Sequence, residues 1–350
     1  MTVVRSTRNP IIVPEDVKPS REDFKVVCVF NAGVTRFQGE VLLLLRVAEV
    51  PLNDNPQVEL VPFFNSAEGQ LQILSFDKTD AAIDFSDSRF VRTGNEQFLT
   101  SISHLRVARS KDGIEFVIDE TPAMFPANVY ERFGIEDPRI TFINGVYYIN
   151  YSAISEVTGV TTCLASTADF KTYTRHGVIF TPDNKDIAIF PEPINGKYYA
   201  FNRPASVEYK RRDMWISESP DLIAWGNHRF MMEAREGFWD DGRIGCSAVP
   251  VRIPEGWLEI YHGSSKDHRY CLGVVLLDAE EPWKIIARGR LPLMEPEADY
   301  ERFGFFGNVI FNCGVLLEDG ILKIYYGAAD TCMGYAEAAL KDVLALLEDQ

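Results

Sequence analysis

Apolar and polar residues alternate along most of the chain, and this period of two predicts β-strands. Strands are expected at residues 25–32 and 39–47, and strands alternating with turns continue from 98 to 335. Helical spacing of apolar residues occurs only at 336–348, where a short terminal helix is predicted. Four turns with a glycine precede alternating segments, most of them rich in aromatic residues: Asn144-Gly145-Val146-Tyr147-Tyr148, Asn195-Gly196-Lys197-Tyr198-Tyr199, Glu255-Gly256-Trp257-Leu258 and Asp319-Gly320-Ile321-Leu322.

A second pattern repeats between these turns: Ser or Thr, any residue, Asp, and an aromatic residue four positions later. The three aspartates are 57 and then 52 residues apart. A repeat of about 50 residues built from strands and turns is typical of β-propeller blades. The aspartates themselves are expected to cap turns by accepting backbone N–H bonds. The three copies are Ser110-Lys111-Asp112 before Phe116, Thr167-Ala168-Asp169 before Tyr173, and Ser219-Pro220-Asp221 before Trp225.

Two segments fall outside this period. Residues 1–24 are polar with three prolines, and we interpret them as a leading arm. Residues 48–97 combine prolines, asparagines and aspartates, and they separate the turn glycines Gly39 and Gly145 by 106 residues, whereas later intervals are 51, 60 and 64. We therefore predict an insertion within the first blade, forming a loop or β-arm. The whole chain, residues 1–350, is predicted to be one all-β domain closed into a ring of blades.

The composition narrows the class of protein. A hydrophobic content of 46% is ample for a core. A net charge of −16 and a pI near 4.8 argue against nucleic acid or an anionic membrane as partner. The six cysteines include no Cys-x-x-Cys pair, which favours buried reduced thiols, and no His/Cys/Asp cluster has metal-ligand spacing. Without a signal-peptide pattern or an apolar run of about 18 residues, we expect a cytoplasmic protein.

In a repeat protein, charged residues at strand ends are the informative departures from the pattern. Residues 134–140 place Glu136 and Asp137 beside Pro138 and Arg139, ahead of a strand expected at 142–151. Arg139 would lower the pKa of a neighbouring carboxyl, so a general acid here needs burial or a sugar hydroxyl that carries its proton. A surface ion pair in a turn is the alternative interpretation.

Several basic residues are predicted to converge. Arg46 and Arg203 each follow a turn glycine by seven residues, so equivalent positions in two blades would direct both guanidinium groups toward one region. Arg243 has glycines on both sides, Gly242 and Gly245, which permit close backbone approach. Arginine forks suit phosphate or carboxylate oxygens, and salt bridges between blades are the alternative.

Further candidates lie at other strand ends. His262 and Tyr326 each follow a turn glycine by six residues, and we expect them to share one neighbourhood. Asp330 is another strand-end carboxylate. Aromatic rings with carboxylates suit a sugar, and converging arginines suit an oxyanion. A site with both favours glycosyl transfer to or from phosphate.

These segments resemble glycoside hydrolase family 130, which contains inverting mannoside phosphorylases and β-mannosidases that fold as five-bladed β-propellers. The resemblance covers nearly the whole chain. It is carried by Gly134-Ile135-Glu136-Asp137-Pro138-Arg139, Phe190-Pro191-Glu192, Asn202-Arg203-Pro204, Gly226-Asn227-His228, Trp257-Leu258-Glu259-Ile260-Tyr261-His262-Gly263 and Tyr325-Tyr326-Gly327-Ala328-Ala329-Asp330-Thr331.

The resemblance implies that Asp137 is the general acid and that its proton passes through the mannose 3-hydroxyl. It implies inorganic phosphate as co-substrate, with no other cofactor. The phosphate would be held by Arg203, Arg243 and His262, with Arg46 close to the same site. The residues expected to contact the mannoside are Asp330, Glu136, Arg139, Glu192, Asn202 and Tyr326.

The implied reaction is the reversible, inverting phosphorolysis of a terminal β-mannoside to α-mannose 1-phosphate. Residues 101–106 and 307–309 look most like those of the β-1,2-mannobiose and oligomannoside phosphorylases. Two alternatives stay open: an inverting β-1,2-mannosidase with Glu192 as the base for water, and a non-catalytic carbohydrate-binding propeller. The leading arm and the terminal helix are candidate contacts of a homo-oligomer.

Overall fold

The computed structural model describes residues 3–94, 96–206 and 208–347. In this part of the chain the strands form five larger sheets, numbered here in chain order, and two smaller ones. The first sheet contains β10 (Val117–Ile118), β9 (Ile102–Ser110), β3 (Glu40–Pro51) and β2 (Phe24–Phe37), and the second contains β11 (Ile135–Ile143), β12 (Val146–Ser155), β13 (Gly159–Thr167) and β14 (Thr174–Phe180).

The other three sheets repeat this antiparallel plan. The third contains β15 (Asn184–Ile189), β16 (Tyr198–Pro204), β17 (Met214–Ser219) and β18 (Gly226–Met232). The fourth contains β19 (Arg243–Cys246), β21 (Gly256–Ser264), β22 (Tyr270–Leu277) and β23 (Ile285–Arg288), with β20 (Val251–Ile253) paired to β21. The fifth contains β24 (Ile310–Glu318), β25 (Ile321–Ala328), β26 (Cys332–Ala339) and β1 (Val4–Arg5).

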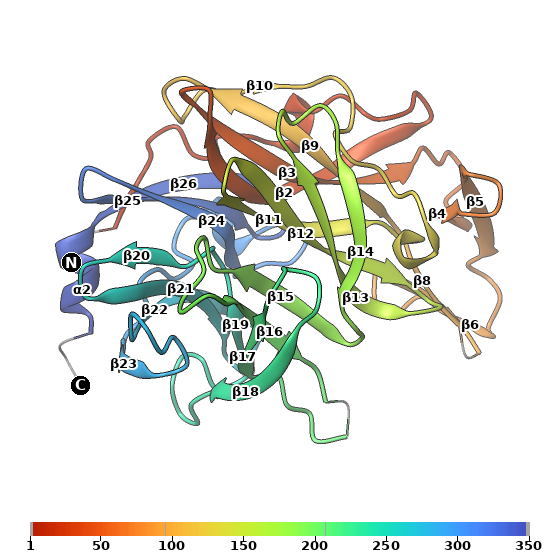
Figure 1. Cartoon of the computed structure of the whole chain (residues 1–350). Coiled ribbons are helices and arrows are strands. Elements are labelled where there is room, and N and C mark those ends of the chain that lie inside the picture. Colours follow the sequence, from red (N-terminus) through yellow and green to blue (C-terminus); the bar gives the residue numbers. More distant parts are fainter. Residues whose placement is uncertain (1–2, 95, 207, 348–350) are drawn as a thin grey trace.

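The hydrophobic core lies between neighbouring sheets. Each of five clusters of buried apolar residues draws members from two adjacent sheets, for example Leu44 with Ile149, and Ile260 with Ile324. The cluster between the fifth and first sheets closes the circle, and Figure 1 shows blue β24–β26 beside red β2 and β3. The predicted all-β class is confirmed, and the circle of sheets is like that of a β-propeller.

The repeated aspartates cap turns, as predicted. One carboxylate oxygen of Asp112, Asp169 or Asp221 accepts two backbone N–H bonds from residues two and three positions later. Asp278 does the same in the fourth sheet. The sequence pattern missed this copy because Leu276 stands where the others have Ser or Thr, and because its aromatic residue, Trp283, follows five positions later instead of four.

The insertion and the terminal helix differ in detail from their predicted bounds. Strand β3 continues to Pro51, and the insertion then forms a β-arm of β4 (Val58–Asn65), β5 (Gln70–Asp77), β6 (Ile83–Asp84), β7 (Phe90–Thr93) and β8 (Glu96–Leu99). The terminal helix α2 spans only Leu340–Ala345, because residues 336–339 extend β26 along β25. Residue 348 lies outside the described residues. The three other short helices are η1 (Pro14–Asp16), η2 (Val129–Glu131) and α1 (Asp299–Arg302).

The leading arm is part of the fifth sheet. Its strand β1 pairs with β26, an element that the sequence analysis missed because it is only two residues long. Arg5 donates from Nε to Oε1 of Glu301 over 2.7 Å, and the hydroxyl of Tyr326 donates to the same oxygen over 2.7 Å. Glu301 is fully buried, so this pair fastens the leading arm to the segment that precedes β24.

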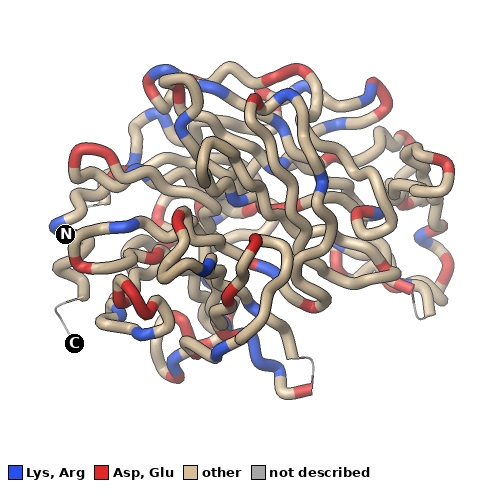
Figure 2. The backbone as a smooth tube through the Cα atoms, viewed as in Figure 1, with Lys and Arg blue, Asp and Glu red and all other residues tan. Residues whose placement is uncertain are grey.

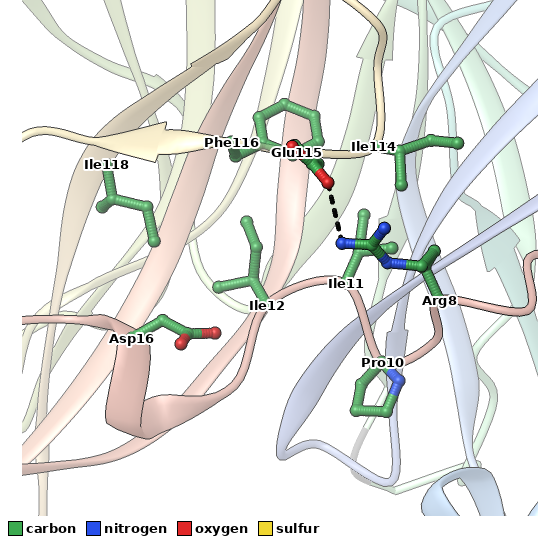
Figure 3. A pocket seen from close by; sticks show the side chains of 9 residues that line it. All are labelled: Arg8, Pro10, Ile11, Ile12, Asp16, Ile114, Glu115, Phe116 and Ile118. Carbon is green, nitrogen blue, oxygen red and sulfur yellow. Dashed lines mark hydrogen bonds and ion pairs between the residues drawn. The ribbon is translucent and has the colours of Figure 1, made fainter.

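The arm also borders a cavity of about 440 Å³ on the outside of the first sheet, shown in Figure 3. An ion pair of 2.8 Å joins Arg8 and Glu115 there, and both side chains are about two-thirds exposed. Charged residues elsewhere lie mostly along the surface loops (Figure 2). No described helix is long and apolar enough to cross a membrane.

We expect Arg5→Ala to lower the free energy of unfolding by about 3 kcal/mol, because it leaves the buried Glu301 carboxylate without its cation. Arg8→Ala is the matched control, and its exposed ion pair should contribute less than about 1 kcal/mol. Urea unfolding measures both variants. Equal losses of stability would contradict this role of Arg5.

Candidate active site

The first strands of three consecutive sheets carry the same one-residue β-bulge. In β2, β11 and β15, two successive residues are left out of the pairing, opposite a single unpaired residue of the next strand. The first skipped residue is Asn31, Asp137 or Asp186, with φ of 48°, 50° and 54°. Asn and Asp tolerate this left-handed backbone better than other non-glycine residues, and bulges redirect side chains. All three side chains line one cavity.

The second strand of each sheet supplies an equivalent residue. In each sheet, the count starts at the residue of the second strand that forms the first pair after the hairpin turn. The seventh residue along that strand is Arg46, Ser152, Arg203, His262 or Gly327, from the first sheet to the fifth. Three of these residues, Arg46, Arg203 and His262, line the cavity. The predicted equivalence of Arg46 and Arg203 therefore matches the register of their strands.

The predicted proximity of His262 and Tyr326 is wrong. Gly256 already pairs with Ile253 as the first residue of β21, whereas Gly320 lies in the turn before β25. His262 is thus seventh and Tyr326 sixth along the strand, and a shift of one residue turns a side chain to the other face. Tyr326 is buried in the core between the fourth and fifth sheets and does not line the cavity.

The cavity has a volume of about 700 Å³ and combines charged residues with aromatic ones. Six of the predicted site residues meet there, from all five sheets or the loops next to them: Arg46, Asp137, Arg203, Arg243, His262 and Asp330. The other described lining residues are Asn31, Arg89, Phe90, Val160, Asp183, Asn184, Lys185, Asp186, Ala205, Arg212, His268, Tyr270, Phe306, Val309 and Phe311.

Asp137 is held by its neighbours through one carboxylate oxygen. Its Oδ1 accepts from Nδ2 of Asn31 over 2.9 Å and from Nη1 of Arg46 over 3.0 Å, and Arg46 also pairs with Glu136 over 2.7 Å. Oδ2 accepts no hydrogen bond from the described residues, so it can take one from a ligand. Burial raises the pKa of Asp137, but the positive charges of Arg46 and Lys185 outweigh burial and hold it below its usual value.

Asp330 approaches the same region from a turn after β25. Ala329 and Asp330 both have left-handed backbone, with φ of 48° and 49°, which is strained for alanine. Burial, with the nearby negative charge of Asp137, raises the pKa of Asp330 to about 6 in spite of Arg46. A carboxylate in this position can accept hydrogen bonds from sugar hydroxyls.

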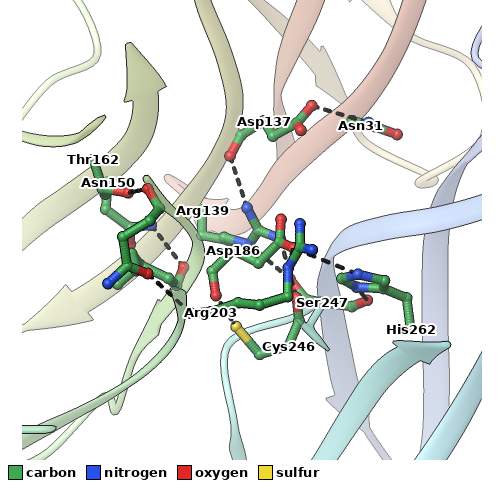
Figure 4. A network of polar contacts seen from close by, with 12 residues as sticks. Asn31, Asp137, Arg139, Asn150, Thr162, Asp186, Arg203, Cys246, Ser247 and His262 are labelled. Atoms are coloured by element: carbon green, nitrogen blue, oxygen red, sulfur yellow. Dashed lines mark hydrogen bonds and ion pairs between the residues drawn. The ribbon is translucent and has the colours of Figure 1, made fainter. Parts of the chain in front are cut away.

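A cationic wall is built around Asp186, as Figure 4 shows. Oδ2 of Asp186 lies 2.6 Å from Nε of Arg203 and 3.4 Å from Nε2 of His262. The other ring nitrogen of His262 lies 3.2 Å from Oγ of Ser247. Burial lowers the pKa of His262 to about 3, although Asp186 opposes the shift, so the ring is neutral at pH 7.

Three more cations complete this wall. Nη2 of Arg243 lies 3.2 Å from Nδ1 of His268, and its guanidinium lies 5.6 Å from the ring centre of Tyr270. Lys185 and Arg212 also line the cavity, and neither forms a salt bridge to a described residue. The sequence analysis missed both of them. Lys185 pairs with Arg203 in the β15–β16 ladder, so counting back across that hairpin could have found it.

The β-arm of the insertion covers part of the cavity. Arg89 and Phe90 reach the cavity from this arm, and the guanidinium of Arg89 lies 5.4 Å from the ring centre of Phe306. Phe306 belongs to the loop that precedes β24. Two loops from different sheets therefore meet above the cavity.

Several residues predicted to bind the substrate do not line the cavity. Arg139 is 1% exposed and donates to the backbone carbonyls of Ser247, Asp137 and Cys246, so it supports the backbone that carries Asp137. Glu136 pairs with Arg46 behind Asp137. Asn202 is also buried, where its side-chain amide donates to Ser217 and accepts from Asn184.

The prediction that Glu192 contacts substrate or activates water is contradicted by its position. Strand β15 starts at the cavity with Asn184, and Glu192 lies beyond its far end. The Glu192 side chain is 57% exposed and 4.0 Å from Arg252. The direction of β15 places this glutamate away from Asp137.

Known proteins resemble the chain over its full length. Residues 88–349 match a family model of glycoside hydrolase family 130 described as beta-1,4-mannooligosaccharide phosphorylase. A beta-1,2-mannobiose phosphorylase from Listeria innocua is 46% identical over 99% of both chains, and a 1,2-beta-oligomannan phosphorylase from a Thermoanaerobacter species is 38% identical over 69% of this chain and 80% of its own length.

Solved structures agree with these matches. The structure of the Listeria innocua beta-1,2-mannobiose phosphorylase in complex with beta-1,2-mannobiose superposes with a TM-score of 0.96 at 45% identity, covering 100% of both chains. A glycosyl hydrolase from Bacteroides ovatus has a TM-score of 0.74 at 22% identity over 97% of this chain and 94% of its own, a likeness of fold alone. On the match of the family model and the 46% identical relative, the chain belongs to glycoside hydrolase family 130 and is a mannoside phosphorylase, a glycosyltransferase-type enzyme.

Proposed function

We propose that the protein phosphorolyses β-1,2-mannobiose or a short β-1,2-oligomannoside with inversion, releasing α-mannose 1-phosphate. The observation that carries this proposal is one cavity that holds both Asp137, with a free carboxylate oxygen, and a wall of cations around Arg203. The full-length similarity to a beta-1,2-mannobiose phosphorylase supports the choice of linkage. The substrates are then the mannoside and inorganic phosphate.

In this reaction Asp137 supplies the proton. A phosphate oxygen attacks C1 of the terminal mannose as the bond from C1 to the leaving oxygen breaks on the opposite face. The leaving oxygen receives its proton from Asp137 through the mannose 3-hydroxyl. The positive charges of Arg46 and Lys185 lower the pKa of Asp137, and the negative charge of bound phosphate would raise it toward the protonated form that the reaction needs.

The phosphate is proposed to bind at Arg203, Arg243, Lys185 and Arg212. No catalytic base is required, because the dianion is already a nucleophile and the cations mainly hold it in position. His262 is neutral and lies almost fully buried between Ser247 and Asp186, so it supports this wall more than it supplies charge. Arg46 belongs to the acid side of the cavity, because it contacts Asp137 and Glu136.

The hydrolytic alternative is weaker. An inverting hydrolase needs a second carboxyl about 6.5–9.5 Å from the acid, with a water between them. Glu192 lies outside the cavity, and Asp186 is engaged by Arg203. A non-catalytic sugar-binding protein would not need a buried carboxyl beside so many cations.

We also propose that the five larger sheets are the blades of one five-bladed propeller, a single catalytic domain over residues 1–350. The five core clusters between adjacent sheets support this division. A cytoplasmic location is proposed because all six cysteines are buried and free. Subunit contacts through the terminal helix remain a prediction.

With β-1,2-mannobiose as substrate, mannose 1-phosphate should form only when inorganic phosphate is added, because the cations hold the nucleophile. Ion chromatography of the sugar phosphate and of free mannose measures the outcome. Equal release of free mannose with and without phosphate would show a hydrolase and reject the proposal.

We expect Asp137→Asn to lower kcat by about 10²–10⁴-fold, because an amide cannot donate the proton. Thermal unfolding should show only a modest loss of stability, since the variant keeps the side-chain volume, its amide oxygen can still accept from Asn31, and Arg46 keeps its pair with Glu136. Glu192→Gln is the control and should keep near-normal turnover, because Glu192 lies outside the cavity. Near-normal turnover of Asp137→Asn would exclude it as the acid.

Asp330→Asn should lower kcat/KM for mannobiose and raise stability at pH 7.5 but not at pH 4. The folded pKa of Asp330 is about 6 and the unfolded value is near 3.9, so only the folded state holds this proton between those pH values. Stability of the natural protein therefore falls as pH rises from about 4 to 6, and the amide removes that loss. Thermal midpoints of the variant and the natural protein at both pH values test this sign.

A further inference from the structure

We propose that Asp186 is a positioning residue for phosphate: its carboxylate holds Arg203 by Nε, so that the two terminal nitrogens of Arg203 stay free for the phosphate. This inference rests on the proposed function. Neither the sequence analysis nor the resemblance singled out Asp186. Its buried carboxylate has two arginine partners, Arg203 and Arg139, and also lies 3.4 Å from the neutral ring of His262.

Arg203 is oriented by its contact with Asp186. Its Nε lies 2.6 Å from Oδ2 of Asp186, and its side chain is 6% exposed. Its Nη1 and Nη2 donate to none of the described residues, while the residue lines the cavity. An arginine held at Nε presents the other side of its planar guanidinium as a pair of parallel donors, the geometry that binds two phosphate oxygens.

Asp186 borders the cavity but is almost inaccessible from it. The residue is 1% exposed, and the positive charges of Arg203, Lys185 and Arg139 outweigh burial and hold the pKa of its carboxyl below the usual value. A carboxylate that stays charged and buried cannot repel phosphate by direct contact, but it can fix the cations that do make contact. It therefore acts through Arg203 and is not a catalytic residue.

The same backbone feature explains why Asp137 and Asp186 have different roles. Each occupies the left-handed position of a bulge, in the second and third sheets respectively. Lys185, the residue just before Asp186, pairs with Arg203 on the next strand. Glu136, the residue just before Asp137, pairs with Ser152. A serine is too short to engage the carboxylate, so Asp137 is held instead by Arg46 of the neighbouring sheet, while Asp186 is held by the arginine of its own sheet.

Asp186 also connects the third and fourth sheets at the phosphate wall. Nε2 of His262 faces the same Oδ2, and Oγ of Ser247 faces the other ring nitrogen. With the ring neutral, Nδ1 can accept from Ser247 when the proton is on Nε2, the nitrogen that faces Asp186. Loss of the carboxylate would release both side chains at once.

The test is a steady-state comparison of Asp186→Asn with the natural protein, with phosphate and mannobiose varied separately. We expect KM for phosphate to rise by about 10-fold or more, because a neutral amide holds Nε of Arg203 less strongly than a carboxylate does. KM for mannobiose should stay within about threefold, a split that a general loss of structure would not give. Similar increases of both KM values, or no change in KM for phosphate, would overturn the proposal.

Asp240→Asn is the matched control. Asp240 is also a fully buried aspartate with two guanidinium partners, Arg235 and Arg288, but it does not line the cavity. This variant should lose stability without a selective change in KM for phosphate. A selective change of the same size in this control would show that any buried aspartate has the effect, and would overturn the proposal.

A double-mutant cycle with Arg203→Lys tests whether Asp186 acts through Arg203. A lysine has one ammonium group and cannot pair with Asp186 while presenting two parallel donors to phosphate. Arg203→Lys alone should raise KM for phosphate, and adding Asp186→Asn should then change it by less than about threefold. Independent, multiplying effects would contradict the proposal. If Asp186→Asn does not fold, an unchanged KM for phosphate in Arg203→Lys overturns it by itself.

The same assays separate this inference from the proposed function. Turnover of mannobiose by the natural protein that does not depend on phosphate would reject the proposed reaction. Phosphate-dependent turnover together with an unselective Asp186→Asn would reject only the positioning role.

Discussion

The constraint on which the site depends is a β-bulge repeated in adjacent sheets. The bulge gives one residue of β2, β11 and β15 a left-handed backbone and directs its side chain into a shared cavity. Asparagine or aspartate stands at each of these positions because few other side chains tolerate that conformation. A structural requirement of the repeat has thus placed an amide and two carboxylates within one pocket, and their neighbours decide what each one does.

Charge pairing then divides the cavity into two sides. Arg46 and Asn31 hold Asp137 by one oxygen, while Arg203 and Asp186 form a pair on the other side. Burying charged groups is costly unless they are paired, and the arginines meet this requirement while keeping donors for a ligand. The remaining cations exceed their protein partners, so an anion such as phosphate completes the balance. The protein as a whole is strongly acidic, so this local excess reflects the site and not the composition.

Much of this arrangement follows from the sequence, and the failures have physical causes. The repeat predicted an all-β ring, and counting from turn glycines brought Arg46 and Arg203 together because both hairpins have the same two-residue turn. The same count failed to distinguish Tyr326 from His262, since Gly256 is already the first paired residue of its strand whereas Gly320 lies in the turn before its strand. Glu192 was misplaced because a motif gives no strand direction. The alternation of apolar and polar residues along a strand does not reveal where a β-bulge lies. For that reason Asn31 and Asp186 were not predicted.

The most direct test of the account is the position of phosphate in a crystal of the protein soaked with phosphate and an uncleavable mannobiose analogue. The account predicts phosphate oxygens within hydrogen-bond distance of the terminal nitrogens of Arg203, with C1 of the sugar between the phosphate and the leaving oxygen. Phosphate bound elsewhere, with Arg203 turned toward another protein group, would contradict it.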